Sequence, residues 1–446
     1  MTTPAPAEAE PGAAPGAAGG MRALTFATVF AAASGYLVML IAGRALGPAD
    51  YPLFATYWGA FFALGGVANG LMQEVTRAVR SARENPAPGG GDPGADDRSA
   101  AEARTRSSRG AVRLLPAGFT LGLILAAAVV VSAPAWPPLG LPTFSGAGVA
   151  IMAFGILGFT LQAATAGVLS GTERWGLYAV LLTVDAALRL AVAGVAWGLG
   201  DTGLGFAVAT VAGAVTWALL IALSPGTRAA LASAVDSGRR RFWRNTATAM
   251  LASAGTSALV TGFPLFVTAT VRDSDPAPLV GAVILAITLT RAPLLVPLTS
   301  FQSAIIVYFV RRRDSGPRSL AAPLGLVTAV GIVGAGAAWL IGPWLIRVLF
   351  GGDFELPGAV LAALTAASVG TAALMVTGNA ALAFDRHLLY NAGWWVAVVA
   401  AAILLVAVPG SLDARAAIAL LSGPGLGVAL HVVGLIAAAR RPGAAE

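Results

Sequence analysis

The chain contains no cysteine and no lysine, and it is poor in charge. Without cysteine, neither a disulfide framework nor a thiolate metal site can form. Without lysine, a glycine-rich phosphate loop that ends in Lys-Ser/Thr is excluded. The two histidines, His387 and His431, lie far apart in the sequence. The sequence therefore predicts no metal site, no cofactor and no catalytic residue of these kinds.

Charged residues make up 11% of the 446 residues, against roughly 25% in soluble proteins. Hydrophobic residues make up 57%, and they come in blocks of about twenty, the length that an α-helix needs to cross a bilayer. This pattern predicts an all-α polytopic membrane protein with about 12 transmembrane helices in two six-helix halves around a central cavity. The expected spans are roughly 22–43, 53–73, 112–133, 147–169, 175–198, 203–223, 246–270, 278–308, 320–341, 357–377, 389–409 and 415–438.

The segments between these spans define the predicted domain organisation. Residues 1–20 are rich in Ala, Pro and Gly and are expected to form a disordered cytoplasmic tail. Residues 21–224 form the N-terminal half, which includes a disordered cytoplasmic loop at 78–111. A basic cytoplasmic linker at 225–245 contains RRRFWRN, which suits a short helix on an anionic leaflet, and residues 246–440 form the C-terminal half.

The arginines predict the orientation, because short loops rich in Arg stay in the cytoplasm. With both termini cytoplasmic, 22 of the 28 basic residues fall in inner segments. The outer loops then hold Arg44, Arg272, Arg347 and Arg415, and two more arginines lie inside spans. Since the basic residues follow helix ends, the positive net charge indicates a plasma-membrane protein rather than a partner of nucleic acid.

The stretch RALGPADYPLF (44–54) connects the first two spans, and GLMQEVTRAV (70–79) ends the second. Both resemble the pattern that follows the first helix of polysaccharide repeat-unit flippases. This family belongs, with the lipid II flippases and the multidrug-and-toxin extruders, to one exporter superfamily. The resemblance in motifs covers about sixty N-terminal residues. Pro52 departs from it, since glycine is usual at that position.

The resemblance implies a transporter, not an enzyme, that moves a polyprenyl-(di)phosphate-linked sugar unit from the inner to the outer leaflet for cell-surface polysaccharide synthesis. Its implied partners are the lipid-linked oligosaccharide, membrane lipids, a polysaccharide polymerase and glycosyltransferases. An anionic head-group would need a cationic cavity, and the planar fork of arginine suits phosphate.

Two spans carry charges near their centres. Arg291 lies close to the middle of the eighth span, where an arginine costs about 2.5–3.5 kcal/mol unless it faces a cavity or a partner. We expect it to bind substrate or, alternatively, to hydrogen-bond between helices. Asp185 and Arg189 share one helix face at i,i+4, which suits either an ion pair or a cavity site.

Three further polar residues, Asn69, Gln73 and Arg77, recur every four positions along the second span and form a polar stripe toward its inner end. Arg44 at the outer mouth would meet the head-group. These four residues complete the predicted substrate site, with the alternative that Arg77 is simply the first arginine of the loop. His431 is expected to be a hydrogen-bonded residue within the bundle.

Three alternatives stay open. A multidrug or small-molecule exporter of the same superfamily fits the spans, although such exporters are expected to use intramembrane carboxylates and Asp185 is the one acid well inside a span. A membrane glycosyltransferase or ligase would need a large outer loop with catalytic residues, and the outer loops are short. A different twelve-span facilitator fold is the third.

Overall fold

A computed structural model of the chain describes residues 15–84, 112–137, 145–200, 203–232, 238–351 and 353–440. Within these ranges the secondary structure is entirely helical. Ten helices are long and apolar enough to cross a membrane, and the bent pair α9–α10 makes an eleventh. Because α1 counts once although it has two arms, the described chain accounts for twelve crossings. The predicted fold class is confirmed.

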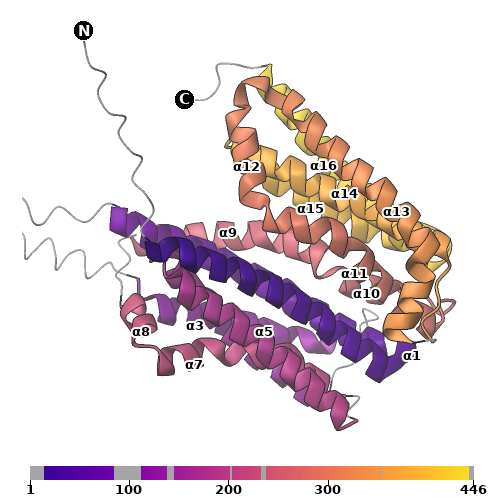
Figure 1. Cartoon of the computed structure of the whole chain (residues 1–446), viewed down its shortest axis with the longest axis horizontal. Helices are drawn as coiled ribbons and strands as arrows, with labels where there is room; N and C mark the ends of the chain where they lie inside the picture. Colours follow the sequence, from indigo (N-terminus) through magenta and orange to yellow (C-terminus); the bar gives the residue numbers. More distant parts are fainter. Residues whose placement is uncertain are drawn as a thin grey trace, which may run out of the picture.

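Helix α1 (Pro15–Glu84) is a hairpin whose two arms meet at Gly47 (Figure 1). Gly47 has φ 67° and ψ 175°, a conformation that a side chain would strain. Pro48 opens the second arm, where a missing N–H costs nothing. Pro52 has no N–H and therefore cannot donate a helical hydrogen bond to the carbonyl oxygen of Pro48. Gly281 packs closely on that oxygen, since a Cβ added to Gly281 would lie 2.1 Å from it. Because proline stands at position 52, the Pro48 carbonyl oxygen lacks a helical partner, and the second half of the protein covers it.

The first half consists of α1 and the helices that pack on it. These are α3 (Leu114–Ser132), η1 (Ala133–Ala135), α4 (Gly146–Gly171), α5 (Trp175–Gly198), α6 (Leu204–Val211), η3 (Ala212–Val215), α7 (Thr216–Leu223) and α8 (Pro225–Leu231). The two arms of α1 contact α4 and α5 extensively, and α3 packs on α4. The sixth span is therefore α6–η3–α7, one crossing with a short 3₁₀ segment in its middle.

The second half begins with α9 (Arg239–Val260) and α10 (Phe263–Ala269), which meet at an angle of 62°. It continues with α11 (Ala277–Ser300), α12 (Gln302–Arg311), η4 (Arg313–Leu320), α13 (Ala321–Phe350), α14 (Gly358–Ala383), α15 (His387–Ala407) and α16 (Leu412–Ala439). Helix α14 is central, since it packs on α11, α13 and α16. Apolar side chains such as Leu326 on α13 and Val433 on α16 remain exposed, as expected of lipid-facing surfaces.

Helix α9 packs along the second arm of α1, where glycines allow close approach. A Cβ on Gly66 would lie 1.8 Å from Oγ of Ser257, and one on Gly70 would lie 2.3 Å from the backbone nitrogen of Met250. Small residues at such spacing let two membrane helices approach backbone to backbone. The first helix of the second half thus lies against the first half, as the pink ribbon beside α1 shows in Figure 1.

Several predicted boundaries are wrong by a few turns. Residues 15–20 and 78–84, assigned to disordered segments, are helical within α1, since each continues an adjoining apolar helix. The eighth span, predicted as 278–308, is broken at Phe301 into α11 and α12. Arg415, assigned to an outer loop, is fully buried in the first turn of α16. The expectations for residues 1–14, 85–111 and 233–237 lie outside the described residues.

Two ends of the bundle can be distinguished. We call the end with Gly47, where the connections at 270–276 and 408–411 also lie, the hairpin end, and the end with α8 and α12 the terminus end (Figure 1). At the hairpin end the two halves are in contact, since Tyr51 of α1 meets Phe354 with ring centroids 5.9 Å apart. Toward the terminus end, α12 and α16 diverge from α1 in Figure 1.

Candidate functional site

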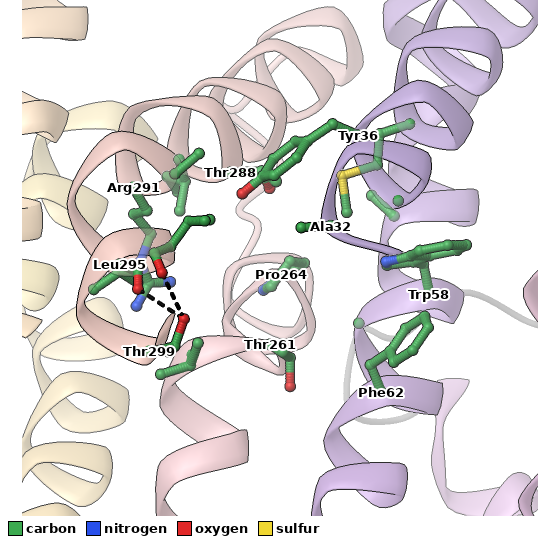
Figure 2. A pocket seen from close by; sticks show the side chains of 18 of the residues that line it. Ala32, Tyr36, Trp58, Phe62, Thr261, Pro264, Thr288, Arg291, Leu295 and Thr299 are labelled. Carbon is green, nitrogen blue, oxygen red and sulfur yellow. Dashed lines mark hydrogen bonds between the residues drawn. The ribbon is translucent and has the colours of Figure 1, made fainter. Parts of the chain in front are cut away.

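A central cavity of about 350 Å³ lies between the two halves. Both arms of α1 form one wall, α11 forms the opposite wall, and the junction of α9 and α10 lies between them (Figure 2). Each helix contributes one face, at intervals of three to four residues: Ala32, Tyr36 and Met39; Tyr51, Phe54, Trp58 and Phe62; Thr288, Arg291, Leu295 and Thr299. The helical spacing of these residues thus places them on helix faces that turn toward the same cavity.

The charge of the cavity comes from Arg291. None of the described residues that line the cavity is acidic, and Arg291 is the one basic residue among them. Aromatic rings dominate the facing wall, and the lining residues with hydroxyls are Tyr36, Tyr51, Thr261, Thr288 and Thr299. Figure 2 shows Tyr36 and Trp58 on α1 across the cavity from Thr288 and Arg291 on α11. Such a space suits a ligand with an anionic group and apolar or ring-shaped surfaces.

The Arg291 side chain is 4% exposed, and its Nη2 donates to the carbonyl oxygen of Leu259 at 3.0 Å and to Oγ1 of Thr371 at 3.4 Å. The carbonyl of Leu259 is free because α9 ends at Val260, and the last carbonyls of a helix lack intrahelical partners. The guanidinium also lies 5.6 Å from the ring centroid of Phe263. Arg291 therefore hydrogen-bonds between helices, which was the alternative expected of it, and it also lines the cavity, while its binding of substrate stays a prediction.

Part of the guanidinium remains without a partner. Nε of Arg291 is buried and makes no hydrogen bond, and no described carboxylate forms an ion pair with this arginine. A buried cation with an unused donor is costly unless a ligand or water completes it. An anionic group in the cavity would supply that acceptor.

Asp185 and Arg189 form the pair that their spacing predicts, behind the cavity wall. Nε and Nη2 of Arg189 donate to the carboxylate at 3.0 and 2.9 Å, and Nε2 of Gln162 donates to it at 3.0 Å. The Arg189 guanidinium also lies 5.0 Å from the ring centroid of Phe62, which lines the cavity. Neither member of the pair lines the cavity itself, so their predicted part in a substrate site stays a prediction.

The predicted stripe of the second span, Asn69, Gln73 and Arg77, is not part of the cavity lining. Nε2 of Gln73 donates to Oγ of Ser253 at 3.4 Å. Arg77 forms a salt bridge with Glu74, whose carboxylate also accepts from Nδ2 of Asn245 on α9 at 3.3 Å. Sequence reasoning gave Glu74 no role, yet it is 4% exposed and connects the two halves. Its position three residues before Arg77, on the same helix face, could have indicated this ion pair from the sequence.

Arg44 lies at the hairpin end, apart from the other predicted residues. Its Nε and Nη2 donate to the carbonyl oxygens of Leu349 at 2.6 Å and Val348 at 2.7 Å. These carbonyls belong to the last turn of α13, where a cation is favourable because the helix dipole is negative. Arg44 therefore connects the first half to the second instead of lining the cavity.

Two other buried polar residues, His431 and Asn379, make hydrogen bonds inside the second half. His431 is fully buried, with Nδ1 2.9 Å from Oγ1 of Thr377 and Nε2 3.2 Å from the carbonyl oxygen of Tyr390. The expectation of a hydrogen-bonded bundle residue is confirmed. Asn379 accepts a hydrogen bond from Gln302 across the α12–α14 contact at 3.1 Å. The aromatic wall of the cavity, by contrast, was not predicted, although its helical spacing is visible in the sequence.

No family model matches the chain. An uncharacterised protein of Mycobacterium bovis is 39% identical over 419 residues, which are 94% of this chain and 92% of that protein. An uncharacterised protein of Mycobacterium tuberculosis is 40% identical over 432 residues, which are 96% of this chain and 93% of that protein.

Solved structures of transporters match this fold. A multidrug resistance MATE family transporter of the MOP superfamily matches with a TM-score of 0.69 in its inward-facing conformation, at 14% identity over 92% of this chain and 95% of that one. An outward-facing conformation gives 0.63 over 95% and 97%. A MOP superfamily transporter from Pyrococcus furiosus, reported with a binding pocket of reverse polarity that suggests a different function, gives 0.55 over 94% and 96%. These matches establish the fold.

Proposed function

This chain belongs to one family with the two mycobacterial proteins and has the fold of the MOP superfamily transporters, and on this premise we propose that it flips a polyprenyl-(di)phosphate-linked sugar unit across the plasma membrane. The observation that carries the proposal is the charge of the central cavity. Its described lining holds Arg291 and no acid, so it favours an anionic head-group and disfavours a cation. The aromatic wall supplies flat apolar faces for sugar rings.

The proposed mechanism is alternating access between the two ends of the bundle. In this structure the hairpin end is held closed by Arg44 on α13, by Tyr51 against Phe354 and by Gly281 against Pro48. From the arginine distribution we infer that the terminus end faces the cytoplasm. The head-group would enter from the terminus end, meet Arg291, and leave when the hairpin end opens, while the prenyl chain stays in lipid.

A transport assay tests the proposal. Purified protein in liposomes is given either a fluorescent polyprenyl-diphosphate-linked sugar, whose flipping a membrane-impermeant quencher reports, or a panel of cationic drugs. We expect protein-dependent flipping of the lipid-linked sugar and no drug uptake. Drug uptake without flipping would overturn the proposal.

The second candidate is a multidrug exporter, which the aromatic wall and the MATE-type fold favour. Many such ligands are cations, and Asp185, the acid that lies well inside a predicted span, is occupied by Arg189 and Gln162. Uptake of anionic or neutral drugs in the same assay, without flipping, would support this candidate.

Replacing Arg44 by glutamine tests the closure of the hairpin end. Two hydrogen bonds from a charged donor are lost, and we expect the closed state to be destabilised by about 1.5 kcal/mol, or about tenfold in population. The natural lack of cysteine allows spin labels at Ala49→Cys and Glu355→Cys, both exposed and one on each half. The distance distribution between the labels should move to longer values in the variant. Arg347→Gln is the matched control, and an unchanged distribution in Arg44→Gln would contradict the assignment.

A further inference from the structure

A second cavity of about 610 Å³ lies at the terminus end of the second half, away from Arg291. We call it the η4 pocket. It is formed by the last turn of α12, the irregular η4 segment, the start of α13 and the last residue of α16, and its lining includes Tyr308, Arg312, Asp314, Arg318 and Ala322. The turn at Gly316, with φ 53° and ψ −139°, shapes its floor.

The η4 pocket presents two guanidinium groups. Arg312 is positioned by Tyr308, since its Nη1 donates to the phenol oxygen at 2.7 Å and the guanidinium lies 4.5 Å from the ring centroid. The phenol in turn donates to the carbonyl oxygen of Ser319 at 3.3 Å. No carboxylate in the described ranges forms an ion pair with Arg312 or Arg318. Two arginines at one cavity, with neither neutralised, attract an anion.

The neighbouring acids do not cancel this charge. Arg313 donates a hydrogen bond to Asp385, and this bond and the positive charge lower the pKa of the Asp385 carboxyl, so Asp385 stays ionised. Neither residue belongs to the pocket lining. Asp314 lines the pocket and is exposed. It leaves a net positive lining, and it adds an acceptor that suits a hydroxyl and repels a bare phosphate dianion.

The depth of the η4 pocket matches that of lipid head-groups. Leu326, four residues beyond Ala322 on α13, is 66% exposed, and four residues of helix span about 6 Å. Val433 on α16 is 64% exposed and Val310 on α12 is 49% exposed, so the helices around the pocket turn apolar side chains outward just beyond it. A polar cavity at the edge of a lipid-facing surface is reached from the membrane interface.

We propose that the η4 pocket binds the phosphate of an anionic phospholipid whose head-group carries hydroxyls, such as phosphatidylglycerol. Arg312 and Arg318 contact the phosphodiester, Asp314 accepts from a head-group hydroxyl, and the acyl chains lie along the exposed apolar face of α13. The site is separate from the central cavity, so it stands whether or not the proposed transport function holds.

Lipid binding to the purified full chain, measured by native mass spectrometry and by thermal stabilisation, tests the proposal. The probes are phosphatidylglycerol, phosphatidylcholine, and inorganic phosphate alone. We expect phosphatidylglycerol to bind, and Arg312→Gln/Arg318→Gln to weaken that binding about tenfold. Arg239→Gln/Arg240→Gln, which removes two exposed arginines at the start of α9, should change it less than twofold.

Equal weakening by the two double variants would overturn the site, because general attraction to the positive surface would then explain the binding. Equal binding of phosphatidylcholine would also overturn it, and equally tight binding of inorganic phosphate would overturn the lipid assignment. If the pocket variant unfolds, Tyr308→Phe keeps the ring and removes the hydrogen bond to Arg312. It should then lower phosphatidylglycerol affinity at unchanged melting temperature.

Discussion

Replacing Arg291 by alanine is expected to lower the affinity for the lipid-linked sugar about 100-fold, which corresponds to about 2.7 kcal/mol. The reason is that Arg291 is the one charged residue in the described lining of the central cavity, and its buried Nε has no acceptor among the residues that the structure describes. The measurement is binding of the polyprenyl-diphosphate-linked sugar to protein in liposomes, together with the flipping rate.

Arg291 also donates to the carbonyl of Leu259, so the control must separate binding from folding. Arg291→Lys keeps the charge but loses the planar fork, and it should recover part of the affinity. Thr371→Val removes the weaker hydrogen bond of Arg291 and leaves the charge, and it should bind nearly as the parent does. If Arg291→Ala flips the lipid at the parent rate with an unchanged melting temperature, the cavity is not the substrate site.

The largest expected effect on stability comes from Asp275 and Arg415, a buried ion pair at the hairpin end whose side chains are 4% and 0% exposed. Replacing Asp275 by asparagine leaves a buried arginine without a counter-charge, and we expect a loss of about 3–5 kcal/mol. Arg415 also donates to the carbonyl oxygens of Thr270 and Leu405, and these hydrogen bonds connect the α10–α11 segment to α15. Thermal unfolding in detergent would report the loss as a lower melting temperature.

A double variant tests the cause of that loss. Asp275→Leu/Arg415→Met removes both charges and leaves an apolar pair of similar size, so it should recover most of the stability. Asp314→Asn removes an exposed acid from the same half and should have no effect. A single Asp275→Asn as stable as the parent would show that the arginine finds solvent or another acceptor.

The sequence predicted the spans well because about twenty consecutive apolar residues carry their own signal. It also placed Arg291 correctly inside α11, and the i,i+4 spacing of Asp185 and Arg189 predicted a pair that the structure contains. These are local properties, decided by residues within a few turns of one another.

The partners of distant residues could not be predicted in this way. Glu74 meets Asn245, and Arg44 meets the end of α13 more than 300 residues away, because packing of the halves brings them together. Arg415 was assigned to a loop because the apolar run begins beside it, and its buried counter-charge, Asp275, lies 140 residues away in the sequence. The cavity lining depends on which face of each helix turns inward, which periodicity alone leaves open in an apolar span.

The turn of α1 has a consequence for how the chain enters the bilayer. Gly47 is the one residue of α1 outside helical conformation, and Arg44 and Asp50 lie three residues to either side of it. Each of these charges costs about 2.5–3.5 kcal/mol at the bilayer centre if it crosses alone. A hairpin carries the two opposite charges across together, and its turn leaves no loop long enough for the arms to insert one after the other. We infer that the insertion machinery places both arms of α1 in the bilayer together, as a helical hairpin. The first arm does not insert alone.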